Sequence, residues 1–101
     1  MINVLLFDLE TTGFPRRSAG KYKPYTNLTA YDTSRIVEIG LIVVEVDEKN
    51  TSTIKREYSF IIKPNNFIIT NSKCHGITQE RAIEEGVGFT DAINAIKHEF
   101  D

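Results

Sequence analysis

Hydrophobic and polar positions divide the chain into a first part that predicts strands and a last part that predicts helices. The run Val4–Phe7 is continuously apolar and too short to cross a membrane, which is typical of a strand covered on both faces. Residues 35–46 are apolar in both alternating registers, so we expect a second strand that is covered in the same way. Glu38 interrupts one face of it, and we expect an arginine to pair with this carboxylate.

A third strand is expected over residues 53–64, because apolar and polar residues alternate there. Its apolar side consists of Ile54, Tyr58, Phe60 and Ile62. This pattern favours a half-buried strand that lies towards a sheet edge and runs antiparallel to its neighbour. The three strands together predict a meander.

Helical patterns begin after Pro64. Residues 65–73 lack periodicity, so we expect an irregular segment packed against the sheet. Thr78 is a good N-cap for a short helix that ends at about Glu85, before Gly86. A second helix begins near Thr90, because apolar residues then recur at helical spacing. They are Phe89, Ala92, Ile93, Ile96 and Phe100.

The segment between the first two strands, residues 14–34, is long, basic and aromatic. Its basic residues are interleaved with tyrosines. The basic residues are Arg16, Arg17, Lys21 and Lys23, and the tyrosines are Tyr22, Tyr25 and Tyr31. Alternating cations and aromatic rings can hold a phosphate backbone and stack on bases. A solvated surface loop is the alternative interpretation. Its length and its position favour a flap that faces a substrate.

Composition bounds the class of protein. The 101 residues suffice for one small domain, and 41% hydrophobic with 26% charged residues is ordinary for a globular protein. No apolar stretch approaches the roughly 20 residues of a membrane span, and no signal peptide is recognisable. Cys74 is the only cysteine, so we expect an intracellular location, in the cytoplasm, nucleus or nucleoid, and no secretion. The net charge of −2 gives no overall basic footprint for nucleic acid, which argues against tight binding of a duplex.

The candidate catalytic residues lie at the end of the first predicted strand. Strand alternation places Asp8 and Glu10 on the same side, about 7 Å apart along the chain. Two carboxylates at the end of a buried strand are costly without a cation between them, and carboxylate oxygens suit Mg²⁺ or Mn²⁺. Thr11, Thr12 and Gly13 follow with hydroxyl and backbone N–H groups. The alternative is that these carboxylates simply begin a solvated loop.

Three segments carry a family resemblance. The string Phe7–Gly13 resembles the first motif of the DEDD-type (DEDDh-like) 3′–5′ exonucleases, a ribonuclease-H-like family that includes proofreading subunits of DNA polymerases. Residues 35–40 resemble the second strand of that family, and His75–Thr78 resembles the segment before its first helix. The three matches occur in the family's order and span nearly the whole chain.

The resemblance implies an α/β fold with a ribonuclease-H-like mixed sheet, of which this chain forms the N-terminal three-stranded meander plus two helices. It implies that Asp8 and Glu10 are catalytic metal ligands. Thr11, Thr12 and Gly13 would hold the terminal nucleotide, Phe14 would wedge beside its base, and His75 would line the same pocket. Taken alone, a histidine is more often a packing residue. Cys74 has no expected role.

The implied activity is two-metal hydrolysis of DNA or RNA phosphodiester bonds, with two Mg²⁺ or Mn²⁺ ions, release of nucleoside 5′-monophosphates, and functions such as proofreading in DNA replication and repair. The implied partners are a single-stranded 3′ end and a DNA polymerase, with no membrane.

The chain departs from the family pattern in one respect. The family's later motifs supply a third and a fourth carboxylate and a general-base histidine, and the spacing of His98 and Asp101 does not match them. We therefore expect residues 1–101 to form one domain, the N-terminal part of an exonuclease domain, that is inactive alone. A catalytically incomplete nucleic-acid-binding or polymerase-associated module is the alternative. An aspartyl-phosphate phosphatase is disfavoured, because that motif requires a second aspartate where Glu10 stands.

Overall fold

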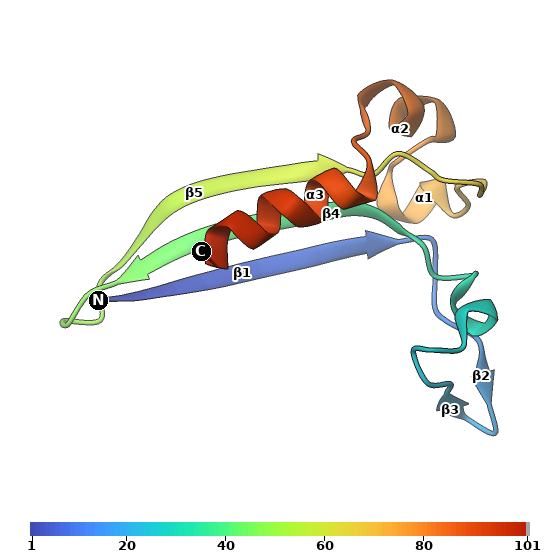
Figure 1. Ribbon diagram of the computed structural model, residues 1–101, viewed down its shortest axis with the longest axis horizontal. Helices are drawn as coiled ribbons and strands as arrows, with labels where there is room; N and C mark the ends of the chain where they lie inside the picture. Colours follow the sequence, from blue (N-terminus) through green and yellow to red (C-terminus); the bar gives the residue numbers. More distant parts are fainter. Residues whose placement is uncertain (101) are drawn as a thin grey trace.

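The computed structural model describes residues 1–100 as a three-stranded sheet with helices on one face and at one end (Figure 1). Asp101 lies outside the described residues. Strands β1 (Ile2–Thr11), β4 (Ile36–Val46) and β5 (Ser52–Ile61) pair in the order β1-β4-β5, and both pairings are antiparallel. This confirms the predicted α/β class and the meander. A single parallel bridge joins Ile62 to Val87 beyond the end of β5.

The helices follow the meander. They are α1 (Ser72–His75), α2 (Gln79–Glu85), α3 (Phe89–Lys97) and a 3₁₀ turn, η2 (His98–Phe100). The two predicted helices are α2 and α3, whereas α1 begins within the segment expected to be irregular. The hydroxyl of Thr78 accepts a hydrogen bond from the Arg81 N–H at 3.2 Å, so the predicted cap is present.

Gly86 ends α2 for a steric reason. A Cβ at this position would lie 2.2 Å from the carbonyl oxygen of Ala82 and 2.7 Å from the backbone nitrogen of Lys63. Only glycine therefore lets the last turn of α2 lie against the chain that leaves β5.

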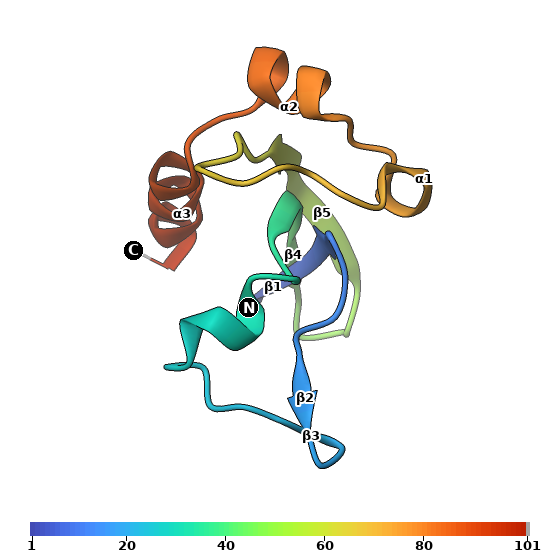
Figure 2. The ribbon, with the colours of Figure 1, turned by 90° about the vertical axis from the view of Figure 1, so that its right-hand side faces the viewer.

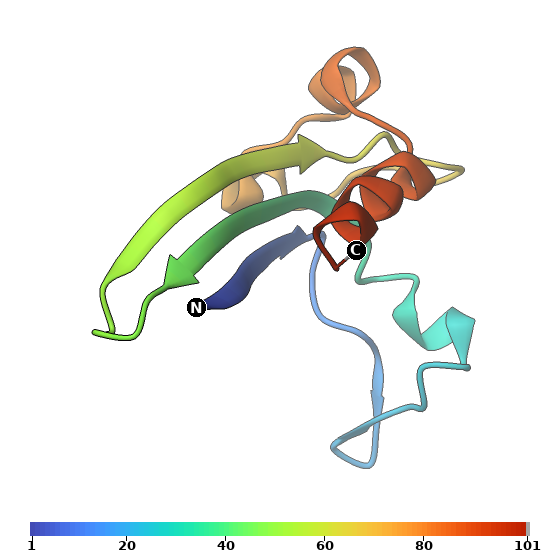
Figure 3. The ribbon, with the colours of Figure 1, turned by 60° about the vertical axis from the view of Figure 1, so that its left-hand side comes forward.

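Two buried clusters hold these layers together. Helix α3 lies over β4 on one face of the sheet (Figure 1), and Figure 3 shows the same helix from its C-terminal end. The first cluster lies between α3 and β4. It consists of Ile39, Leu41, Ile62 and Ala92. The second cluster joins the start of β4 to the segment that contains α1 and α2, and consists of Val37, Ile69, Ile77 and Ala82. The apolar residues of α3 are buried or half-buried at its centre, at Ala92, Ile93 and Ile96. Phe89 and Phe100, the first and last residues of the predicted apolar pattern, are exposed.

The prediction that the first strand is covered on both faces is wrong for the described residues. Leu6 is 52% exposed and Phe7 is 68% exposed. Within residues 1–100, β1 pairs only with β4, which leaves its other edge open. Strand β4 is buried on the α3 side and half-buried on the other side. It therefore also differs from the prediction that both of its faces are covered.

The apolar side of β5 also differs from the predicted one. Ile54 is 60% exposed, because the register skips Lys55 and pairs Ile54 with Val44. Tyr58 pairs with Leu41 and faces α3, so the extra residue moves Ile54 to the opposite face. A β-bulge of one residue always reverses the alternation in this way.

Glu99 ties the C-terminal turn η2 to β5. Its carboxylate accepts hydrogen bonds from Arg56 Nη2 at 2.7 Å and from the Tyr58 hydroxyl at 2.7 Å. The hydrogen bonds from Arg56 and Tyr58 lower the pKa of Glu99 below its ordinary value. The ionised carboxylate is therefore the form that the folded chain stabilises.

We expect Glu99→Gln to lower the thermal unfolding temperature at neutral pH. Because the folded-state pKa of Glu99 is lowered, its contribution to stability is present above the ordinary value of 4.5 and is lost as the pH falls through the folded-state pKa. Thermal melts from pH 7 to pH 3 should show the two proteins converge in acid. Glu85→Gln, which breaks an exposed pair with Arg81, is the control and should cost little. A constant difference at all pH values would contradict this role.

The open edge of β1 should make the chain self-associate. An exposed apolar strand with unpaired backbone groups is a template for another strand, and a charge on it opposes such pairing. Phe7→Lys should therefore reduce the concentration-dependent association seen by sedimentation velocity. Ile83→Lys, at a half-exposed apolar position on α2, should leave association unchanged. A chain that stays monomeric at high concentration without any substitution would disprove this expectation.

Candidate active site

Asp8 and Glu10 lie on the sheet face opposite α3. The register of the antiparallel pair sets Asp8 opposite Gly40 and Glu10 opposite Glu38. Leu41 is buried against α3, and neighbouring residues of a strand point to opposite faces, so Gly40 and its partner Asp8 belong to the other face. The two carboxylates are therefore on one side of β1, as the alternation predicts.

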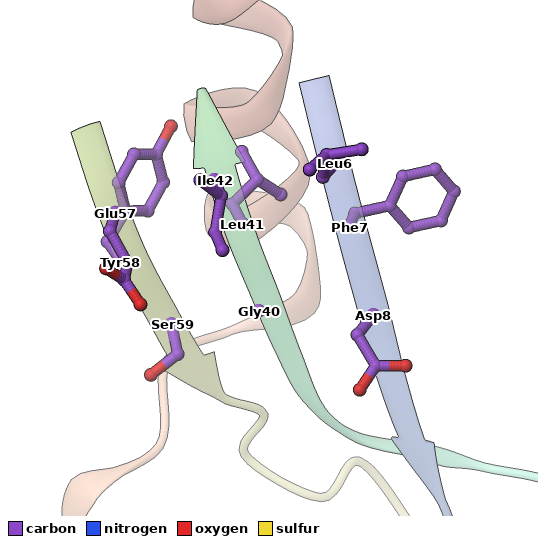
Figure 4. A pocket seen from close by; sticks show the side chains of 9 residues that line it. All are labelled: Leu6, Phe7, Asp8, Gly40, Leu41, Ile42, Glu57, Tyr58 and Ser59. Carbon is purple, nitrogen blue, oxygen red and sulfur yellow. The ribbon is translucent and has the colours of Figure 1, made fainter. Parts of the chain in front are cut away.

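A hollow of about 470 Å³ lies beside Asp8 (Figure 4). Asp8, Gly40 and Ser59 are paired in one row across the three strands, and Gly40 contributes no side chain to that row. The depression is lined by Leu6, Phe7, Asp8, Gly40, Leu41, Ile42, Glu57, Tyr58 and Ser59. The Asp8 carboxylate thus borders an open depression of the sheet.

The acidic side chains on this face lie close to one another without cationic partners among the described residues. Glu10 and Glu38 stand directly opposite each other, and like charges at such positions repel. No lysine or arginine of residues 1–100 forms an ion pair with Asp8, Glu10 or Glu38. The prediction of an arginine partner for Glu38 is therefore wrong. Only the pairing register of β1 and β4 reveals that Glu38 lies across from Glu10.

Repulsion between the carboxylates, rather than their burial, is what favours a cation at this face. Asp8 and Glu10 are exposed, so the desolvation expected for a buried strand is absent. Mutual repulsion remains, and their oxygens are the ligands that Mg²⁺ and Mn²⁺ prefer. In the described part of the chain, no group of three His, Cys, Asp or Glu side chains is arranged to hold a metal ion. Asp8 and Glu10 thus fit part of a divalent-cation site.

The turn after β1 is fixed by its own hydrogen bonds. Thr12 is only 4% exposed, and its hydroxyl donates to the carbonyl of Thr33 at 3.1 Å and accepts from the Arg35 N–H at 3.0 Å. The Thr11 hydroxyl donates to the carbonyl of Gly13 at 3.1 Å. Gly13 has a φ of 153°, which favours glycine. The Thr12 hydroxyl therefore holds the turn in place.

A second hollow, of about 390 Å³, lies at this turn. It brings together three of the predicted substrate-binding residues, Thr12, Gly13 and Phe14. The other lining residues are Asp32, Thr33, Arg35, Phe67, Ile68, Thr70 and Asn71. The Arg35 guanidinium lies 4.2 Å from the centre of the Phe67 ring. Sequence reasoning missed Arg35 and Phe67 at this site, because they are 32 residues apart in the chain.

His75 is held by its own loop. Its Nδ1 accepts from the Ile77 N–H at 3.0 Å, and its Nε2 donates to the carbonyl of Thr70 at 2.7 Å. Both ring nitrogens are thus used by backbone groups. His75 is not part of the lining of the second hollow, which it reaches only through Thr70. The neighbouring Cys74 is exposed.

Comparison with known proteins identifies the family. A sequence model of the exonuclease family (RNase_T) matches residues 5–97. The chain belongs to the exonuclease family. This confirms the resemblance to DEDD-type, ribonuclease-H-like exonucleases, and it supports a nuclease and hydrolase function in general. No curated protein and no solved structure gave a match. Among the described residues, no helix is long and apolar enough to cross a membrane.

We expect Mn²⁺ to bind this chain weakly, with a dissociation constant on the order of 1 mM, because two carboxylates are only part of a site. Isothermal titration calorimetry should show that binding is lost in the double variant Asp8→Asn, Glu10→Gln. The matched control is Glu80→Gln, Glu84→Gln, which removes the same charge from α2. Undiminished binding in the first variant, or equal loss in both, would reject Asp8 and Glu10 as ligands.

Proposed function

We propose that this chain carries the carboxylates and the terminal-nucleotide turn of a 3′–5′ exonuclease that hydrolyses phosphodiester bonds and releases nucleoside 5′-monophosphates. One observation carries the proposal. In a chain of the exonuclease family, Asp8 and Glu10 share an open sheet face without a cationic partner among residues 1–100, directly before a preformed turn. The family's use of divalent metals supports Mg²⁺ or Mn²⁺ as the cofactor.

Asp8 and Glu10 would hold the divalent ions. When bound, such ions activate water and stabilise the charge that develops on the leaving oxygen. The protein's own contribution is to fix the strand end. The hydrogen bonds of Thr12 set the path of the backbone, and Phe14, which is 78% exposed, offers a ring for contact with a terminal base.

Arg35 supplies the positive charge at the turn. Its guanidinium lies over the Phe67 ring, and no carboxylate among residues 1–100 pairs with it. Stacking on a ring keeps the guanidinium in place while its N–H groups stay available for a phosphate. Asp32 lines the same hollow and opposes an anion there, so Arg35 would offset this charge for a bound phosphate.

A catalytically incomplete nucleic-acid-binding or polymerase-associated module is the second candidate. It is favoured by the observation that Asp8 and Glu10 are joined by no third metal ligand within the described residues. The two candidates differ in a single property, which is metal-dependent release of mononucleotides.

We expect the chain alone to release no nucleotide, and expect release once the family's later motifs are supplied on the same chain or in trans. The assay uses oligonucleotides labelled at the 5′ end with Mg²⁺ or Mn²⁺. Shortening from the 3′ end and nucleoside 5′-monophosphates as products would support the proposal. Asp8→Asn should then lower kcat/KM by roughly 10³-fold, as the loss of several kcal/mol of charge stabilisation requires.

Two results would contradict the proposed 3′–5′ exonuclease with Asp8 and Glu10 as metal ligands. Shortening from the 5′ end would contradict the direction, and full activity of the Asp8→Asn variant would remove the carboxylates from the reaction. Binding of the strand without release in the completed protein would select the binding module instead. Glu80→Gln serves as the control for the loss of one exposed carboxylate.

A further inference from the structure

The segment between β1 and β4 forms an ordered arm rather than a plain loop. We propose that this arm, residues 14–31, binds single-stranded nucleic acid next to the candidate active site. The inference rests on the proposed function, because it names how the substrate of that site is held. Its test is a binding measurement that does not require hydrolysis.

The arm is a small hairpin followed by a 3₁₀ turn. Strands β2 (Arg17–Ser18) and β3 (Lys21–Tyr22) are joined by Ala19 and Gly20, whose φ values of 53° and 78° are those of a tight hairpin turn. The 3₁₀ turn η1 (Leu28–Tyr31) leads back to the sheet. Figure 2 shows the hairpin extending away from the sheet and its helices.

Internal hydrogen bonds give the arm a defined shape. Arg16 donates from its backbone N–H to the carbonyl of Ala30 and from Nη1 to the carbonyl of Thr29, both at 2.7 Å. The Tyr31 hydroxyl donates to the carbonyl of Lys23 at 2.5 Å. Arg16 and Tyr31 are therefore structural, and Lys23 takes part only through its backbone. A shape that exists before binding lowers the entropic cost of holding a ligand.

The base of the arm is fastened beside the catalytic candidates. The Thr33 hydroxyl donates to the carbonyl of Phe14 at 2.7 Å, and the Thr12 N–H donates to the carbonyl of Arg35 at 2.9 Å. These bonds close the arm at the end of β1, the strand that carries Asp8 and Glu10. A single-stranded nucleic acid whose 3′ end lies at the carboxylates can therefore continue along the arm.

The arm exposes rings that its fold does not use. Tyr25 is 85% exposed and Tyr22 is 51% exposed. The Arg17 guanidinium lies 5.0 Å from the centre of the Tyr22 ring, which orients that ring. Exposed aromatic rings held in place are the platforms on which unpaired bases stack.

The arm also concentrates positive charge. It contains 4 of the 12 lysines and arginines of the chain and none of its 14 acidic residues. Lys21 and Lys23 form no ion pair within residues 1–100. The nearest acidic residue in sequence is Asp32, just beyond η1. Cations interleaved with exposed rings match the alternation of phosphate and base along a single strand, whereas a duplex hides the faces of its bases.

The test measures binding of the full chain to fluorescently labelled 12-nucleotide single strands, DNA and RNA, by anisotropy at several salt concentrations. Lys21→Ser, Lys23→Ser should weaken binding and reduce the slope of log K against log salt by about 1.4, since each contact to a single strand contributes about 0.7. Tyr25→Ser should weaken binding by about 5- to 150-fold, the range found for loss of one stacked base.

The matched control is Lys49→Ser, Lys97→Ser, which removes the same charge from the β4–β5 turn and the end of α3. Circular dichroism melts verify that every variant is folded. An unchanged affinity and slope in the arm variants, or the same change in the control, would overturn the proposal. So would an equal effect of Tyr25→Ser on duplex binding, because stacking needs unpaired bases. Absence of nucleotide release after the later motifs are supplied, with binding to the arm intact, would instead count against the proposed function alone.

Discussion

The ladder of hydrogen bonds between β1 and β4 is the interaction on which the rest of the structure depends. Its register decides that Asp8 faces Gly40 and that Glu10 faces Glu38. Because side chains alternate, a slip of one residue would turn both carboxylates towards α3 and would bring Phe7 and Leu9 to the open face. The candidate site therefore exists only in this register. Leu5 of β1 packs against the buried cluster that contains Ile39 and Leu41, and this contact favours the same register.

The turn after β1 depends on residues from two distant parts of the chain. The Thr12 side chain forms hydrogen bonds with Thr33 and Arg35, just beyond the arm. The side-chain amide of Asn71, from the segment before α1, donates to the Thr12 carbonyl. Asn71 has a φ of 60°, in the left-handed region that asparagine tolerates better than most residues. Folding of the last third of the chain thus fixes the shape of a turn near its beginning.

Much of this arrangement could be predicted from the sequence where the determinants are local. Caps and apolar spacing define α2 and α3, and alternation along one strand puts Asp8 and Glu10 on the same side. The remainder depends on contacts between distant residues. The bulge that turns Ile54 to the other face, the pairing of Glu38 with Glu10 and the stacking of Arg35 on Phe67 leave no local pattern. The exposure of β1 depends on what lies beside it, which an apolar run cannot reveal.

Gly40 has a consequence for how the Asp8 carboxylate can be reached. Gly40 places no side chain on β4 between Asp8 and Ser59, so a molecule can approach the carboxylate over the middle of the sheet as well as from the free edge. A methyl group at this position would find its nearest atom, the backbone oxygen of Asp8, at 4.0 Å and would fit the fold. Glycine at this position therefore affects access to Asp8 and is not needed for folding, in contrast to Gly86, where the backbone itself leaves no room.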